Sequence, residues 1–185
     1  KKLFKKAIKI IPSGAQTFSK SYLQWPINVS PTFLKEGKGC IVKDVDNNKY
    51  IDYLLALMPI ILGYANKEVD KSVCEQIKKG TILSLSHPSE VELSETLIKL
   101  IPYAEMVKFA KNGSDALSAA VRLSRAFTGR DLVAVSGYHG WHDWYVGTTT
   151  RDYGIPNTIK KLTKKFNFND INSLHAVLGK SPNKF

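Results

Sequence analysis

The chain has 185 residues, of which 43% are hydrophobic, and it carries a formal net charge of +11. This length and composition are sufficient for a globular fold with a core, and they exclude an intrinsically disordered chain. No apolar run reaches the ~20 residues of a membrane span, and the longest candidate, 54–62, contains Pro59. The basic N-terminus, 1–6, is not followed by an apolar signal region, so we expect a cytoplasmic protein.

The positive charge comes almost entirely from lysine. Arginine supplies the forked donors preferred for phosphate and base recognition, and it occurs only at positions 122, 125, 130 and 151. Most lysines are interleaved with acidic residues, which is typical of a solvated surface. We therefore predict no nucleic-acid partner, although a non-catalytic basic binding domain remains the alternative of another class.

The cysteine and histidine spacing gives no pattern typical of a metal site. Cys40 and Cys74 lack CxxC spacing, and we expect reduced thiols in the core rather than a disulfide. His139 and His142 lie three residues apart with Asp143 adjacent, but no third or fourth ligand follows at zinc spacing. We predict no metal site.

A helix and an antiparallel sheet are expected at the start of the chain. Apolar residues at positions 3, 4, 7, 8 and 11 predict an amphipathic helix, which Pro12-Ser13-Gly14 ends. Residues 33–53 then alternate short apolar runs with turn residues, including Asn47-Asn48, and this pattern predicts a β-meander.

Helices and strands alternate in the rest of the chain. Asn66 and Gly80 mark the two ends of one helix, whose buried face would carry Val69, Val73 and Ile77. Alternation from Met106 onward predicts an α/β fold with a parallel sheet. The expected elements are helices at about 66–80, 88–101, 114–129 and 169–178 and strands at 106–110 and 132–136.

The turn Asn112-Gly113-Ser114-Asp115 separates the strand predicted at 106–110 from the next helix. A strand, a Gly-Ser turn and a helix point free backbone N–H groups and the positive end of the helix dipole at an anion. The alternative is an ordinary connection in which Ser114 is the N-cap of the helix.

A second polar loop, Gly137-Tyr138-His139-Gly140, follows the strand predicted at 132–136. The carboxyl ends of parallel strands lie at one edge of a sheet, where ligands bind, so we expect the two loops to lie together. The pair would suit a ligand with a phosphate and a flat ring, on which Tyr138 could stack.

Five segments follow one another along the chain: Asp44-Val-Asp-Asn-Asn-Lys-Tyr-Ile-Asp-Tyr, Pro59-Ile-Ile-Leu-Gly, Asn112-Gly-Ser-Asp-Ala, Arg122-Leu-Ser-Arg-Ala-Phe-Thr-Gly-Arg and Tyr138-His-Gly. In this order they resemble motifs of the class III pyridoxal-phosphate-dependent aminotransferases, and in particular of the branch that contains glutamate-1-semialdehyde 2,1-aminomutase.

This resemblance implies the pyridoxal-phosphate-dependent transferase fold of type I, as a truncated large domain with a mostly parallel sheet. Residues 1–60 would be an N-terminal segment of the small domain, and residues 61–185 the first part of the cofactor-binding large domain. The resemblance also implies a homodimer when complete, with a small-molecule amino donor and a carbonyl acceptor as partners. The implied pyridoxal 5'-phosphate (PLP) contacts are Asn112, Gly113, Ser114, Tyr138 and His139.

Departures from the aminomutase pattern favour a related aminotransferase with another substrate. Lys20 stands where the family pattern has a substrate-binding Arg, and it can pair with a carboxylate only as a point charge. Leu57-Met58-Pro59 lacks the Trp that the aminomutase has before its Gly-Pro. Trp141 belongs to a loop more similar to such relatives, and we assign Lys20 and Trp141 to substrate binding.

The family's Schiff-base Lys and the Asp that pairs with the pyridine nitrogen would lie beyond Phe185. No lysine of this chain is in a matching motif, so no catalytic residue is assigned. We expect residues 1–185 to be an incomplete and inactive portion of an enzyme that transfers amino groups. Glutamate-1-semialdehyde 2,1-aminomutase activity remains the alternative.

Overall fold

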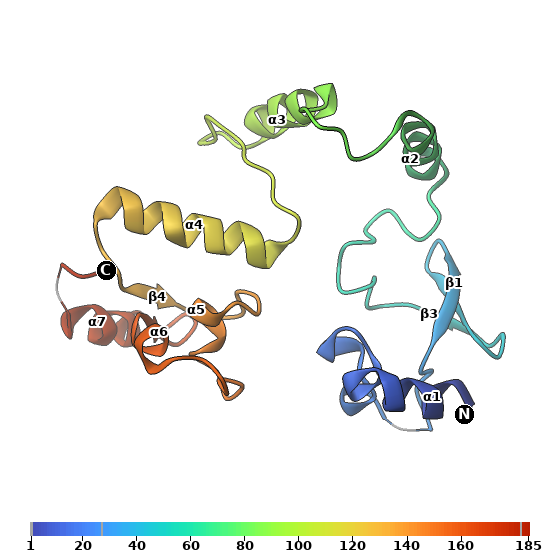
Figure 1. The fold of residues 1–185 in the computed structure, drawn as a ribbon, viewed down its shortest axis with the longest axis horizontal. Coiled ribbons are helices and arrows are strands. Elements are labelled where there is room, and N and C mark those ends of the chain that lie inside the picture. The colour runs from blue at the N-terminus through green and yellow to red at the C-terminus, as the bar shows by residue number, and fades with distance from the viewer. Residues whose placement is uncertain (1, 27, 182) are drawn as a thin grey trace. The chain divides into compact units, whose positions relative to one another are not determined.

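A computed structural model describes residues 2–26, 28–181 and 183–185. The chain divides into two compact units, Lys1–Ser86 and His87–Phe185. Figure 1 shows their helices and strands in chain order. In the sequence, the boundary between the units falls between residues 86 and 87. The domain boundary of an aminotransferase, predicted between residues 60 and 61, stays a prediction.

The first unit begins with α1 (Lys2–Ile10), which buries Ala7. The ring of Phe4 meets that of Tyr22 edge-on, at a centroid distance of 5.3 Å. This contact holds the predicted amphipathic helix against three short 3₁₀ turns, η1 (Pro12–Gly14), η2 (Phe18–Lys20) and η3 (Tyr22–Gln24).

The predicted β-meander is confirmed. Strands β1 (Leu34–Lys38), β2 (Ile41–Asp44) and β3 (Lys49–Ile51) form an antiparallel sheet in that order. Asp44 organises the predicted turn, since its carboxylate accepts hydrogen bonds from the backbone N–H groups of Asp46 and Asn48 at 2.9 Å each. Its other oxygen accepts from the Asn48 amide at 2.8 Å and the Tyr50 hydroxyl at 3.1 Å.

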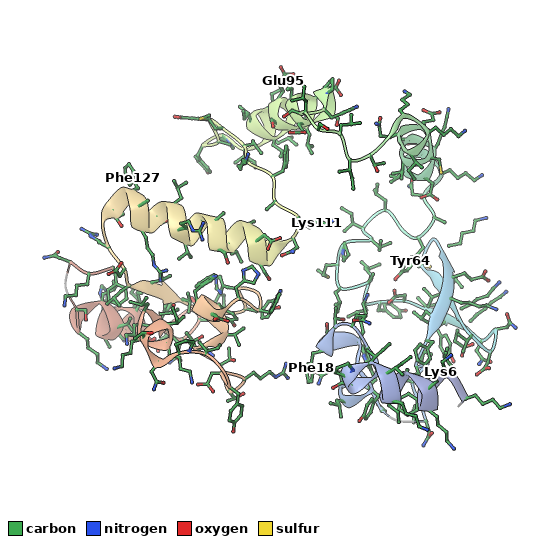
Figure 2. The ribbon with its side chains drawn as sticks, in the orientation of Figure 1. Lys6, Phe18, Tyr64, Glu95, Lys111 and Phe127 are labelled. Atoms are coloured by element: carbon green, nitrogen blue, oxygen red, sulfur yellow. The ribbon has the colours of Figure 1, made fainter. Side chains whose placement is uncertain are left out.

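Helices α2 (Lys67–Lys79) and α3 (Pro88–Leu100) form where the sequence predicts them. The Asn66 side chain caps α2, and Gly80 follows its last residue. Their apolar faces were expected to be buried, but within this chain they are exposed, with Ile77 59% and Val91 61% accessible. Figure 2 shows that the side chains of both helices, including Glu95 of α3, project away from the helices.

The cysteine prediction is half right. Cys40 and Cys74 are free thiols, but both are exposed rather than part of the core. Cys74 lies on α2, whose apolar side chains have no cover within this chain, and this explains the error.

The second unit contains a two-stranded parallel sheet, β4 (Val133–Val135) paired with β5 (Thr163–Lys165). α4 (Gly113–Thr128) precedes β4 and ends at Gly129, which has the left-handed φ of 66°. Val135 and Thr163 are buried, and α7 (Ile171–Gly179) contacts β4. Two short helices, α5 (Asp143–Val146) and α6 (Asn157–Lys161), connect the strands and were not predicted, nor was β5.

The strand predicted at 106–110 is wrong, because these residues form no regular element. A strand needs a neighbour to pair its backbone groups, and none of the described strands pairs with this segment. Met106 is accordingly 90% exposed. Among the described helices, none is both long enough and apolar enough to span a membrane.

Candidate functional site

The start of α4 presents unpaired backbone donors. Asn112 is the N-cap, and its side-chain oxygen accepts from the Asp115 N–H at 3.1 Å. Ser114 is therefore not the cap, which corrects the alternative interpretation of this turn. Within the described ranges, the N–H groups of Gly113 and Ser114 have no hydrogen-bond acceptor. Such first-turn donors, together with the helix dipole, favour an anion.

Space for a ligand lies next to these donors. A Cβ atom added to Gly113 would have no atom within 4 Å apart from its chain neighbours and the helix backbone. Gly113 is exposed, and Ser114 is partly exposed. The absence of a side chain at position 113 thus leaves a free approach to the α4 N-terminus, as a phosphate group requires.

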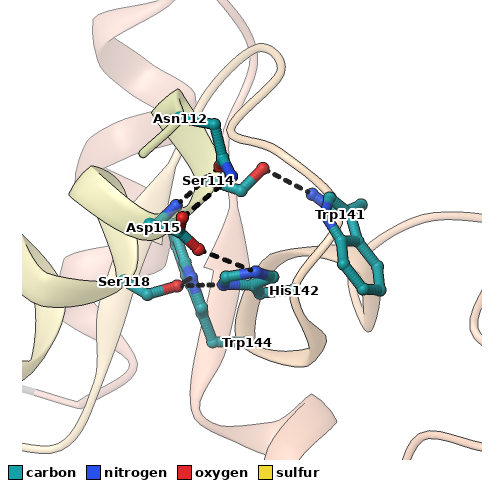
Figure 3. A network of polar contacts seen from close by, with 7 residues as sticks. All are labelled: Asn112, Ser114, Asp115, Ser118, Trp141, His142 and Trp144. Atoms are coloured by element: carbon teal, nitrogen blue, oxygen red, sulfur yellow. Dashed lines mark hydrogen bonds and ion pairs between the residues drawn. The ribbon is translucent and has the colours of Figure 1, made fainter. Parts of the chain in front are cut away.

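The loop after β4 lies directly against this turn, as Figure 3 shows. The backbone N–H of Trp141 donates to Ser114 Oγ at 3.3 Å. Gly140 has a φ of +95°, and a Cβ there would come within 2.3 Å of Ser114 Oγ and 3.1 Å of Ser114 Cα. Glycine is therefore needed at position 140 both for its backbone conformation and for the close approach to α4.

Tyr145 holds the loop in shape from within. Its side chain is 5% exposed, and its hydroxyl donates to the Gly137 carbonyl at 2.7 Å. The ring of Tyr138 meets it edge-on at 5.7 Å, and the ring of His139 lies 5.4 Å from it. Tyr138 itself is 80% exposed, so its ring is available to a ligand.

A network of polar side chains joins the loop to the second turn of α4 (Figure 3). His142 Nδ1 lies 2.6 Å from Ser118 Oγ, and its Nε2 lies 3.6 Å from Asp115 Oδ1. Trp144 Nε1 donates to Ser118 Oγ at 2.9 Å, and Asn112 Nδ2 donates to Asp115 Oδ2 at 2.8 Å. The side chain of His142 is 29% exposed, so these contacts are partly shielded from water.

Six of the residues predicted from the sequence gather around the start of α4. Asn112, Gly113 and Ser114 lie on the α4 turn, and Tyr138, His139 and Trp141 lie on the adjoining loop. Trp141 is 71% exposed. Lys20 belongs to the first unit, where it closes η2 with an exposed side chain. The binding roles of these residues stay predictions.

Sequence reasoning missed Ser118, Trp144 and Tyr145 as organising residues. Ser118 falls one helical turn after Ser114 on the same side of α4, and this spacing was the available signal. The contacts of Trp144 and Tyr145 depend on residues elsewhere in the fold, and no local sequence pattern indicates them. No group of three or more His, Cys, Asp or Glu side chains in the described part of the chain could hold a metal ion.

Comparison with known families accounts for this arrangement. The profile of the family described as Aminotransferase class-III matches residues 24–181. The fold is that of the PLP-dependent transferases of fold type I. The chain belongs to the class III aminotransferase family, whose cofactor is PLP. The predicted family, fold and cofactor are confirmed.

Two curated relatives illustrate the range of activities in the family. The chain is 42% identical over 177 residues to 3-aminobutyryl-CoA aminotransferase of Cloacimonas acidaminovorans, covering 95% of this chain and 42% of that protein. It is 41% identical over 176 residues to glutamate-1-semialdehyde 2,1-aminomutase of Methanothermobacter thermautotrophicus, covering 89% of this chain and 41% of that protein. The chain thus spans less than half the length of these relatives.

Solved structures agree with the family assignment. The FumI protein of a Sphingopyxis species, solved in a form with PLP, superposes with a TM-score of 0.89 at 30% identity, over 98% of this chain and 43% of that one. An omega-transaminase from Sphaerobacter thermophilus gives a TM-score of 0.87 at 22% identity, over 100% of this chain and 45% of that one, which shows the shared fold alone. The free donors, the open space at Gly113 and the exposed Tyr138 fit the phosphate and the ring of PLP.

Proposed function

We propose that the chain provides the phosphate and ring contacts of an enzyme that uses PLP to transfer an amino group from an amino donor to an aldehyde or keto acceptor. The observation that carries this proposal is the α4 N-terminus, where two free N–H groups face open space beside an exposed aromatic ring. Bound PLP supplies the electron sink for the reaction.

The α4 turn would hold the phosphate. The N–H groups of Gly113 and Ser114 donate to the phosphate oxygens, and the helix dipole adds favourable electrostatics. Ser114 Oγ already accepts from the Trp141 N–H through a lone pair, which leaves the hydroxyl hydrogen free to donate to the same phosphate. A charge-assisted hydrogen bond of this kind is stronger than a neutral one.

The loop after β4 would hold the ring. Tyr138 would stack on the pyridine, since it is 80% exposed while the ring of Tyr145 supports it at nearly a right angle. The ring of His139 clusters with those of Trp144 and Tyr145, at centroid distances of 6.2 Å and 5.4 Å, and would support the loop beneath the cofactor. Asn112 keeps the turn in place by capping α4.

Substrate recognition would use Lys20 and Trp141. The Lys20 ammonium can pair with a carboxylate as a point charge, and the exposed Trp141 indole beside the phosphate turn can contact the carbon skeleton of a substrate. The relatives named aminomutase keep glutamate-1-semialdehyde 2,1-aminomutase as a second candidate. Lys20 and Leu57-Met58 depart from the aminomutase pattern and favour amino transfer between two different molecules.

The reacting lysine is proposed to come from outside residues 1–185, which by themselves would be inactive. The relatives are more than twice as long as the matched region, which leaves room for that lysine and for the carboxylate on the pyridine nitrogen. The complete protein is proposed to be a cytoplasmic homodimer. The exposed apolar faces of α2 and α3 support a need for further cover.

Borohydride trapping with peptide mapping tests this proposal, alongside amino-transfer assays with several amino donors. In the natural full-length protein that contains these residues, one lysine outside 1–185 should be labelled stoichiometrically, and transfer should be measurable. Residues 1–185 expressed alone should show diffuse labelling and no transfer, because surface lysines are not held and activated beside the cofactor. A single labelled lysine within 1–185 would contradict the assignment of the reacting lysine. A full-length protein that does not bind PLP would favour the alternative of a non-catalytic basic binding domain that retains the fold.

A further inference from the structure

We infer that His142 is a positioning residue for the cofactor: its imidazole fixes the ring-bearing loop and the phosphate turn of α4 in one geometry before PLP binds. The inference rests on the proposed function, since it concerns the same site. His142 itself contacts neither the free N–H groups nor the face of Tyr138. It acts through Ser118 and Asp115.

The direction of each hydrogen bond follows from the donor inventory. Trp144 Nε1–H can only donate, so Ser118 Oγ accepts from it. His142 Nε2 lies 3.6 Å from Asp115 Oδ1, which is too far for a hydrogen bond. The hydrogen of the Ser118 hydroxyl remains free to be donated to the imidazole. His142 Nδ1 then accepts the Ser118 hydroxyl hydrogen. These two contacts, one at each ring nitrogen, hold the orientation of the imidazole.

His142 provides the shortest link between the loop and α4. Its contact to Ser118, at 2.6 Å, is closer than that of Trp144 to Ser118, at 2.9 Å, or of the Trp141 N–H to Ser114, at 3.3 Å. The paired residues are 24 to 27 positions apart in sequence, so no local turn geometry can replace these links. Without His142, the loop that carries Tyr138 would lose the shortest of these three contacts to α4.

A second effect concerns the charge next to the phosphate turn. Asp115 follows Ser114 directly, and a carboxylate at this helix position can turn back to the N-terminal N–H groups in a capping box. Here one oxygen accepts from Asn112 Nδ2 and the other faces His142 Nε2. His142 and Asn112 together therefore hold the Asp115 carboxylate in this orientation beside the phosphate turn.

Ser, His and Asp also occur together in hydrolases, and the geometry argues against that use here. Ser118 lies in the second turn of α4, and its oxygen accepts the Trp144 N–H while its hydrogen points to His142. A catalytic triad also needs a carboxylate that is hydrogen-bonded to the histidine, whereas Asp115 Oδ1 lies 3.6 Å from His142 Nε2, beyond hydrogen-bond distance. In this network, the serine oxygen joins two side chains of the loop.

The test is a PLP titration of the natural full-length protein and of His142 variants, read by cofactor absorbance and by visible circular dichroism. His142→Ala should raise the dissociation constant of PLP about tenfold and reduce the dichroic band. The loop that carries Tyr138 loses its contacts to Ser118 and Asp115, so the pyridine ring is held less firmly. His142→Asn, which keeps a polar atom near the position of Nδ1, should recover most of the affinity. His142→Gln reaches only toward Asp115 and should recover less.

Two further variants separate the effect of the network from a general effect on folding. His175→Ala on α7 is the matched control, since its exposed ring is outside the network, and it should bind PLP as the wild type does. Ser118→Ala removes the partner and should weaken binding in the same direction, even if His142→Ala fails to fold. Wild-type affinity in Ser118→Ala, and in His142→Ala where that variant folds, would overturn the inference alone. A wild-type protein that binds no PLP would overturn the proposed function together with it.

Discussion

The β-meander and the α4 site are both organised by polar side chains, but over different distances along the chain. In the meander, the Asp44 carboxylate binds partners no more than six residues away. At the site, Ser114 and Ser118 bind partners 24 to 27 residues away. The meander is thus a local structure, while the site exists only once α4 and the loop after β4 have come together.

This difference locates where substitutions should act. Changes in the meander should alter the stability of a turn, whereas changes at the site should alter the affinity for PLP. The predictions below test this separation in the natural full-length protein that contains these residues.

Gly113→Val should have the largest effect. Its side chain would fill the open space in front of the free N–H groups, so PLP affinity should fall at least about 100-fold, or about 2.7 kcal/mol. The matched control is Gly179→Val on α7, where an added Cβ also meets no atom within 4 Å. Equal PLP affinity of the two variants, measured by absorbance titration, would place the phosphate elsewhere.

Ser114→Ala should weaken PLP binding by about 1.5–3 kcal/mol, because one hydrogen bond to a charged phosphate is lost. The variant also removes the acceptor of the Trp141 N–H. Ser124→Ala, further along α4, is the control for helix effects. If the two variants bind PLP equally well in the same titration, the Ser114 hydroxyl does not contact the phosphate.

Gly140→Ala should separate the loop from α4. Both Gly140 and Gly137 have positive φ angles, +95° and +83°, but only a Cβ at 140 meets Ser114. Gly137→Ala therefore measures the backbone cost alone, and Gly140→Ala should be less stable than it by about 1–3 kcal/mol from the steric overlap. Thermal unfolding of the pair checks this, and equal stability would contradict the close approach.

Tyr145→Phe should cost about 1 kcal/mol of stability, since it removes the hydroxyl that donates to the Gly137 carbonyl. Tyr153→Phe is the control, because that side chain is 96% exposed. Denaturant unfolding should separate the two variants. A Tyr145→Phe protein as stable as Tyr153→Phe would show that the hydroxyl does not hold the loop.

The meander should give the smallest effect, and one that depends on pH. The Asn48 side-chain amide, aided by other donors, lowers the pKa of Asp44 below its usual 3.8. A lowered folded-state pKa stabilises the turn above pH 3.8, and this contribution is lost as the pH falls through the folded-state pKa. Asp44→Asn should remove this acid dependence, and the exposed Asp46→Asn should retain it. NMR shifts of the turn amides report the difference.

The same contrast explains how much could be predicted from the sequence. Asn47-Asn48, Asn66 and Gly129 act on their own neighbours, so the meander, α2 and the end of α4 were predicted correctly. The 106–110 segment has a strand pattern, but pairing requires a neighbour that the described chain does not provide. Local pattern cannot reveal such a missing partner.

For the site, the two loops were predicted as neighbours because both follow segments expected to be strands of one parallel sheet, and the structure brings them together. The links through Ser118, His142 and Tyr145 could not be predicted, since each depends on a partner from another part of the fold. Asn112 rather than Ser114 caps α4, because the Asn112 side chain reaches the Asp115 N–H and leaves the serine hydroxyl for other partners.

A crystal structure of the natural full-length protein with PLP tests the central claim most directly. The account predicts that phosphate oxygens accept hydrogen bonds from the Gly113 and Ser114 N–H groups and that the pyridine ring stacks on Tyr138. A phosphate bound away from the α4 N-terminus, or a ring with no contact to Tyr138, would contradict it.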